Sequence, residues 1–163
     1  MGIIKRCILC VLCIVFCIVM CAGCGDKAKP LSPKEITDII KSNNASDIVW
    51  TPLNANDISA YFGFSDENVT GLSVFINDDD EHYDIAAAIE FKTSEDMWAV
   101  VESLNKSLIA AKETFDNVNN SEAAKIKNKL ILKNDKMLVV VVSNNYEKIG
   151  KELAKHGFVS VEK

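Results

Sequence analysis

Arginine is almost absent from this 163-residue chain, in which Arg6 is the single example. A guanidinium group can bind a phosphate or a carboxylate through two parallel hydrogen bonds. Residues 24–163 lack this group, which lowers the expectation of an enzyme that acts on anionic substrates. The same residues hold all 23 acidic side chains but only 16 of the 18 basic ones, a net charge of −7. That charge argues against binding to nucleic acid or to an anionic lipid surface.

Cysteine does not occur after Cys24, and all six cysteines of the chain lie within residues 7–24. Cys7, Cys10, Cys13 and Cys17 have the spacing of a bacterial iron–sulfur sequence. The residues between them are all apolar, without the Gly, Pro or polar residues that would let a loop gather several thiolates around one ion. A single apolar helix would instead separate these thiols along a rod. The pattern therefore disfavours a cluster or disulfides here, and the rest of the chain has no thiol for redox chemistry or metal binding.

The apolar run is also short for a membrane-spanning helix. It covers residues 7–21 and follows Lys5 and Arg6, whereas a span needs about 20 apolar residues. A short positive segment, an apolar stretch and small residues are typical of a secretory signal peptide. The sequence Cys21-Ala22-Gly23-Cys24 resembles the lipobox of bacterial lipoproteins. In that motif, cleavage precedes the last cysteine and its thiol carries a diacylglycerol.

This resemblance predicts the organisation of the chain. Residues 1–23 are expected to be a cleaved lipoprotein signal peptide, with Cys24 as the lipidated residue. Residues 24–32 would then be a short tether and 33–163 a single domain. Two acyl chains give stable membrane attachment, so the expected location is the outer face of the cytoplasmic membrane. An uncleaved N-terminal anchor helix is the alternative.

The chain after the tether begins with helix signals. Ser32 and Glu35 have the spacing of a capping box and Pro33 stands at the first helical position. They predict a helix from 33 to about 42. A second, short helix is expected at 57–62.

Apolar and polar residues then alternate in two segments, 72–76 and 85–91, which predicts two strands joined by an acidic loop at 77–84. Thr93 is expected to cap a long helix. Its apolar residues recur at spacings of four and three, as in a buried stripe: Met97, Val101, Leu104, Leu108, Ala111 and Phe115. The polar segment 117–122 is expected to end this helix.

A second pair of strands is predicted at 130–132 and 137–142. The continuous apolar run at 138–142 is typical of a central strand buried on both faces. A last helix is expected to begin after Asn145 and to end at Gly157. The order ααββαββα predicts an α+β fold, a two-layer sandwich in which helices pack on an antiparallel four-stranded sheet.

This order, together with the lipobox, resembles a family of small lipoproteins of low-GC Gram-positive bacteria, the domain of unknown function 4358. The stretches that carry the likeness are 60–63, 85–91 with the helix cap 93–96, and 129–143. The resemblance covers about 35–158. It implies a signal peptide followed by one domain of this pattern, and it implies no activity, substrate or cofactor.

The densest charged run, 77–84, is the candidate cation site. Asp78, Asp79, Asp80 and Asp84 could supply carboxylate oxygens to calcium, but the run lacks the turning glycine and alternate spacing of an EF-hand loop. A solvated hairpin tip is the favoured interpretation. His82 alone among these acids would make a poor zinc site, which takes three or four fixed ligands.

Trp50 and Trp98 are the candidates for a partner-binding patch, with ordinary packing at the edge of the core as the simpler interpretation. The sequence contains no catalytic motif. We therefore expect a non-enzymatic domain without a cofactor that binds an envelope protein or component. A small-ligand or cation-binding accessory domain is the alternative, followed by a carboxylate-based hydrolase. A partner module should expose an apolar patch, a ligand binder should contain a pocket, and a hydrolase should bring carboxylates together in a cleft.

Overall fold

The computed structural model describes residues 30–45, 47–78 and 81–161. The predicted signal peptide and Cys24 lie outside these residues. The described chain forms five helices: α2 (Pro33–Ser42), α3 (Ala55–Phe62), α4 (Ser94–Asp116), α5 (Asn120–Lys127) and α6 (Tyr146–Ala154). Its six strands are β1 (Thr51–Leu53), β2 (Val69–Asp78), β3 (Tyr83–Phe91), β4 (Leu130–Asn134), β5 (Met137–Val142) and β6 (Val159–Ser160).

The six strands form one sheet in the order β1-β2-β3-β5-β4-β6, and every neighbouring pair is antiparallel. The mixed helix-and-strand class and the antiparallel sheet predicted from the sequence are confirmed. The prediction of four strands is wrong, because β1 and β6 extend the sheet at its two edges. These strands have three and two residues, too few to show an alternating pattern in the sequence.

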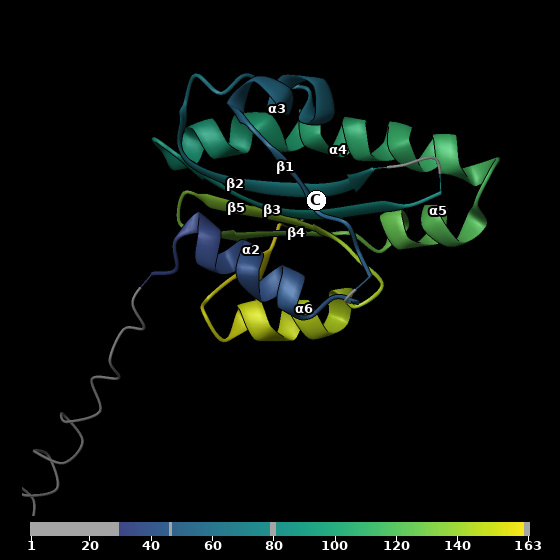
Figure 1. Cartoon of the computed structure of the whole chain (residues 1–163). Coiled ribbons are helices and arrows are strands. Elements are labelled where there is room, and N and C mark those ends of the chain that lie inside the picture. The colour runs from purple at the N-terminus through teal and green to yellow at the C-terminus, as the bar shows by residue number, and fades with distance from the viewer. Residues whose placement is uncertain (1–29, 46, 79–80, 162–163) are drawn as a thin grey trace, which may run out of the picture.

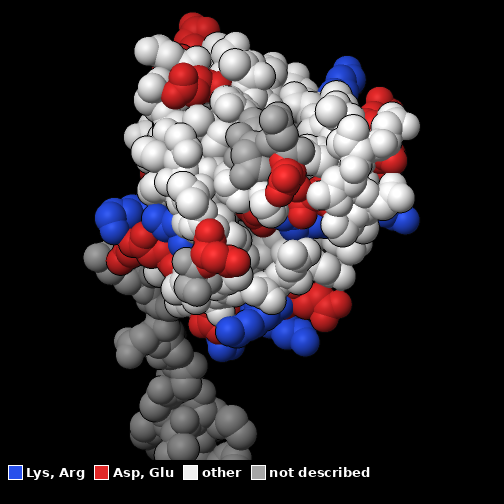
Figure 2. Space-filling model, turned by 45° about the vertical axis from the view of Figure 1, so that its right-hand side comes forward, with Lys and Arg blue, Asp and Glu red and all other residues white. Residues whose placement is uncertain are grey.

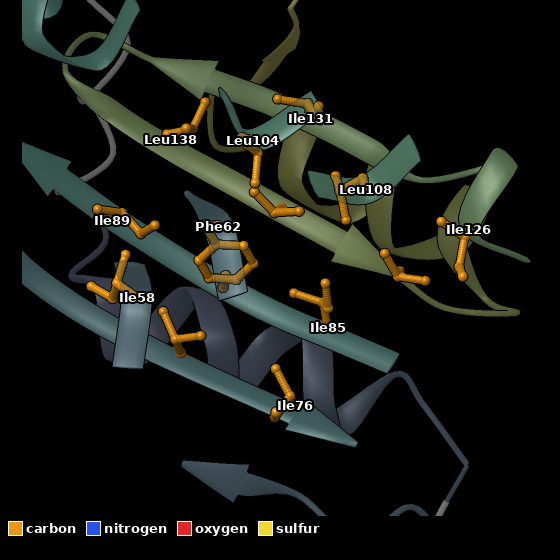
Figure 3. Close-up of a cluster of buried hydrophobic side chains, with 14 of the residues drawn as sticks. Ile58, Phe62, Ile76, Ile85, Ile89, Leu104, Leu108, Ile126, Ile131 and Leu138 are labelled. Atoms are coloured by element: carbon orange, nitrogen blue, oxygen red, sulfur yellow. The ribbon is translucent and has the colours of Figure 1, made fainter. Parts of the chain in front are cut away.

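Helices cover both faces of the sheet, as Figure 1 shows with α3 and α4 on one side and α2 and α6 on the other. Side chains from α3, α4 and α5 form one apolar cluster with strands β2–β5, part of which is drawn in Figure 3. Those from α2 and α6 form a second cluster on the opposite face. The domain therefore has three layers, and the predicted two-layer sandwich is wrong in this respect.

The central strands explain why two helical layers are possible. All six residues of β5 are buried, which confirms the prediction of a strand covered on both faces. In β3, Ala86 and Ala88 lie in the second cluster with Ile36 and Ile40 of α2. Small side chains at these positions let a helix pack close to the sheet.

The start of α2 and the glycine turn after α6 follow the predicted signals, whereas α3 begins two residues earlier than expected and Asn145 makes no side-chain capping hydrogen bond to α6. The Ser32 hydroxyl accepts a hydrogen bond from Glu35 N at 3.3 Å, while Glu35 Oε2 accepts one from Ser32 N at 2.7 Å. The last helix ends in a short turn in which Gly157 has φ +82°, and the next residue, Phe158, is buried. A left-handed glycine followed by an apolar contact satisfies the last carbonyls of a helix.

Helix α5 is a feature that the sequence interpretation missed. The segment 117–122 was expected only to end the long helix, and α4 does end at Asp116. Asn119 then caps a new helix, because its side-chain oxygen accepts hydrogen bonds from Ser121 N at 3.2 Å and Glu122 N at 3.4 Å. An Asn followed three residues later by Glu is a recognisable helix start, so the signal was present.

Replacing Thr93 with alanine is expected to lower the free energy of unfolding by about 1 kcal/mol. The Thr93 hydroxyl accepts a hydrogen bond from Asp96 N at 3.1 Å, and alanine would leave this donor at the start of α4 without that partner. Urea denaturation followed by circular dichroism measures the change. Thr114→Ala is the control, since Thr114 is exposed within the same helix and alanine favours helix. Equal losses in both variants would contradict the capping role.

Candidate functional site

A buried group of three charged side chains lies where α5 meets the start of β3. Lys125 Nζ is 2.9 Å from Asp84 Oδ1 and 2.6 Å from Glu122 Oε2. The three side chains are between 2% and 9% exposed. Lys125 is the one buried cation among the described residues, and Asp84 and Glu122 are the buried anions. We call these three residues the charged triad.

Backbone and amide hydrogen bonds fix the carboxylates of the triad. Tyr83 N donates to Glu122 Oε2 at 2.8 Å, which joins the first residue of β3 to α5. Asn77 Nδ2, near the end of β2, donates to Asp84 Oδ2 at 3.4 Å. Apolar residues of α5 position Lys125, because Ala123 and Ile126 are buried in the cluster that also contains α4. The triad therefore ties α5 to the β2–β3 hairpin.

A cavity of about 350 Å³ adjoins the triad. Its lining combines charged, amide and apolar side chains from the ends of β2 and β5, the start of β3, α5 and the segment after α2: Ala45, Asp47, Ile48, Val49, Asn77, His82, Asp84, Glu122, Lys125 and Asn144. We call it the triad cavity. Its volume lies at the lower end of the range for small-molecule sites.

Hydrogen bonds between α2 and the end of β5 position one wall of the triad cavity. The Ser143 hydroxyl bonds to the side chain of Asn44, and it also accepts a hydrogen bond from Asn145 N at 2.9 Å. Asn145 Nδ2 donates to the carbonyl oxygen of Asn43 at 2.9 Å. These bonds hold the end of α2 against the end of β5, and the wall residues Asp47 to Val49 follow directly.

The structure corrects the expectation of a solvated loop over 77–84. Strand β2 continues to Asp78 and β3 begins at Tyr83, so the connection between the strands is shorter than expected. Asp84 is buried in β3 and paired with Lys125, and the ammonium lies where a bound cation would meet that carboxylate.

The structure describes only part of the other three candidate aspartates. The backbone of Asp78 pairs with Tyr83, while its side chain and both Asp79 and Asp80 lie outside the described residues. His82 is exposed and lines the triad cavity. Within the described part of the chain, no three His, Cys, Asp or Glu side chains form a group that could hold a metal ion.

The two tryptophans lie in different parts of the domain. Trp50 is half-buried and packs against the cluster that contains α2 and α6. Trp98 lies on α4, which packs on the opposite face of the sheet, and 43% of it is exposed. Lys133 Nζ is 4.9 Å from the centre of the Trp98 ring, a distance compatible with a cation–π contact. The structure therefore does not bring Trp50 and Trp98 into one patch.

Sequence reasoning missed Glu122 and Lys125 because it missed α5. Their spacing of three residues places them on one face of a helix, and Glu122 follows the Asn119 cap. In Figure 2, which brings the α5 end of Figure 1 forward, acidic and basic side chains lie close together on the surface.

Scans of the chain against protein-family models, curated proteins and solved structures find no match. None of the helices that the structure describes between residues 30 and 161 is long and apolar enough to cross a membrane. The function proposed below therefore rests on this chain's own residues.

Proposed function

We propose that this chain is an extracytoplasmic lipoprotein, held by a lipid on Cys24 at the outer face of the cytoplasmic membrane. Its single domain binds an envelope protein or component and catalyses no reaction. The proposal includes membership of the family that the sequence resembles. The observation that carries the binding role is the triad cavity, which lies at the end of the sheet away from the start of the domain.

The direction of β3 shows that the start of the domain and the triad cavity lie at opposite ends of the sheet. Pro30 to Pro33 lie beside Glu90 and the β4–β5 turn, where they line a separate hollow of about 580 Å³. The triad cavity contains Asp84, at the other end of β3. Glu90 is six positions after Asp84 along β3, a distance of about 20 Å. In Figure 1 the same direction runs from the start of α2, at the left, to α5, at the right.

A lipid on Cys24 would place the start of α2 next to the membrane. Pro30 is six positions after Cys24, and an extended chain of that length reaches about 20 Å. The triad cavity would then face away from the bilayer, toward components of the envelope. This arrangement supports a binding role at the membrane-distal end of the domain.

The triad supports binding better than hydrolysis. A hydrolase that uses two acids needs one carboxyl to give a proton and the other to act as base or nucleophile. Here both carboxylates bind the same ammonium group, at 2.9 and 2.6 Å. The cavity also favours a small-ligand role as the second candidate function, because charged, amide and apolar groups all line it.

Replacing Cys24 with alanine is expected to move the protein out of the membrane fraction or leave an unprocessed precursor. Without two acyl chains the remaining affinity for a bilayer is marginal, and we expect at least about a tenfold loss of the processed, membrane-bound form. Fractionation of cells with immunoblotting, together with metabolic labelling by a fatty acid, measures both changes. Cys17→Ala, in the apolar run outside the lipobox, is the matched control and should be processed, labelled and retained. Normal labelling and retention of the Cys24→Ala variant would overturn the anchor.

A further inference from the structure

The charged triad carries an excess negative charge. Asp84, Glu122 and Lys125 are the buried charged residues of the described chain, so two carboxylates share one ammonium. A buried charge is costly unless it is paired and hydrogen-bonded. Lys125 and either carboxylate form a neutral pair, and the negative charge of the other carboxylate remains beside the triad cavity.

One oxygen atom marks where this excess charge can be compensated. Glu122 Oε2 lies 2.6 Å from Lys125 Nζ and accepts a hydrogen bond from Tyr83 N, whereas no hydrogen bond joins Oε1 to the residues that the structure describes. No fully buried polar side-chain atom of those residues lacks a partner, so Oε1 is in contact with solvent, and Glu122 lines the triad cavity. Glu122 as a whole is only 7% exposed. A hydrogen-bond donor that carries positive charge would satisfy this oxygen.

The other residues that line the triad cavity indicate which kind of cation it would bind. Asn77 and Asn144 offer amide oxygens, and the exposed Asp47 adds a second negative charge at the rim. Ile48 and Val49 provide apolar contact for carbon atoms. An ammonium group needs up to three acceptors and tolerates amide oxygens, whereas calcium needs six to eight oxygen ligands.

We propose that the triad cavity binds a small organic cation with a primary ammonium group. The ammonium N–H donates a hydrogen bond to Glu122 Oε1, and the alkyl part of the cation packs against Ile48 and Val49. The inference rests on the proposed binding role and names its ligand class. It does not depend on the membrane anchor. His82, which also lines the cavity, is the remaining group there that can carry positive charge.

The test is a titration of the full chain, purified in a non-ionic detergent, with n-butylammonium chloride. Two-dimensional ¹H–¹⁵N NMR should show a saturable shift of the Tyr83 amide, because this group donates to Glu122 Oε2. Titration with n-butanol, which has the same alkyl chain without the charge, should give no saturable shift. A shift of equal size with butanol, or none with butylammonium, would overturn the proposal. Saturation of the same amide by calcium chloride at lower concentration would also overturn it.

Two variants locate the site. Glu122→Gln removes the excess charge and should weaken binding of butylammonium by about tenfold or more. Glu147→Gln makes the same change in charge on the exposed surface of α6, and its affinity should match that of the parent chain. Asp47→Asn, at an exposed position on the rim, should weaken binding about threefold. Unchanged affinity in both cavity variants would contradict the assignment, even if Glu122→Gln alone perturbs folding.

A second probe, N-acetyl-lysine methylamide, distinguishes two sources of the ammonium group. Tighter binding than that of butylammonium identifies a lysine side chain of an envelope protein, and weaker binding identifies a free amine. Either result supports the ammonium site. If neither butylammonium nor N-acetyl-lysine methylamide binds, the ammonium site is overturned. If membrane attachment still depends on Cys24 in that case, the proposal of an anchored binding domain stands.

Discussion

Replacing Lys125 with methionine is expected to lower the free energy of unfolding by about 3–5 kcal/mol, the usual effect of removing one partner from a buried ion pair. The variant would leave Asp84 and Glu122 buried without the cation that both of them bind. Methionine has a similar length and an apolar character, so loss of packing contributes little. Urea denaturation of the parent and variant chains, followed by far-ultraviolet circular dichroism, gives the difference.

Lys112→Met is the matched control for this change. Lys112 is paired with Asp116 on the same side of α4, but its side chain is 32% exposed. An exposed ion pair contributes about 1 kcal/mol or less, so this variant should change stability little.

A third variant separates loss of charge balance from loss of contacts. Adding Asp84→Asn and Glu122→Gln to Lys125→Met removes all three charges, and most of the lost stability should return. A loss below about 1 kcal/mol in Lys125→Met itself would contradict a network that holds α5 against the hairpin.

Replacing Ile40 with alanine is expected to lower the free energy of unfolding by about 2–5 kcal/mol. Ile40 is 0% exposed and packs in the cluster with Ala86, Ala88 and Leu153. The alanine side chains beneath it cannot fill the space that the isoleucine would leave. The same denaturation measurement applies.

Ile109→Ala is the control, because it makes the same chemical change on α4 at a position that is 47% exposed. Its expected effect is below about 1 kcal/mol. Similar small losses in both variants would show that α2 does not cover a packed face of the sheet, and would contradict the third layer.

The sequence predicted those parts of the fold that depend on neighbouring residues. Thr93 and Ser32 mark helix starts through hydrogen bonds that span three residues. The continuous apolar residues of β5 indicate burial on both faces. Helix α2 packs on the face of the sheet that contains Ala86 and Ala88, about 50 residues further along the chain. Nothing in the sequence around these alanines indicates which helix will cover them. A helical stripe predicts that one face is buried and does not say against which surface.

The candidate site was less accessible from the sequence. Asp84 ends a run of acidic residues, and nothing in the neighbouring sequence separates it from the other acids of the run. Its partner Lys125 is 41 residues away, so only the folded chain brings the two together. Prediction of α5 from the Asn119 cap would have placed Glu122 and Lys125 on one face. Their burial still depends on the packing of Ala123 and Ile126 against α4.

The short outer strands have a consequence for how copies of this protein behave when they meet. A long, flat outer strand is a template onto which another chain can add by backbone hydrogen bonds, the first step of aggregation. Here β1 has three residues, one of them Pro52, which has no N–H to donate, and β6 has only two. These two outer strands therefore offer another copy of the domain few backbone groups with which to form hydrogen bonds.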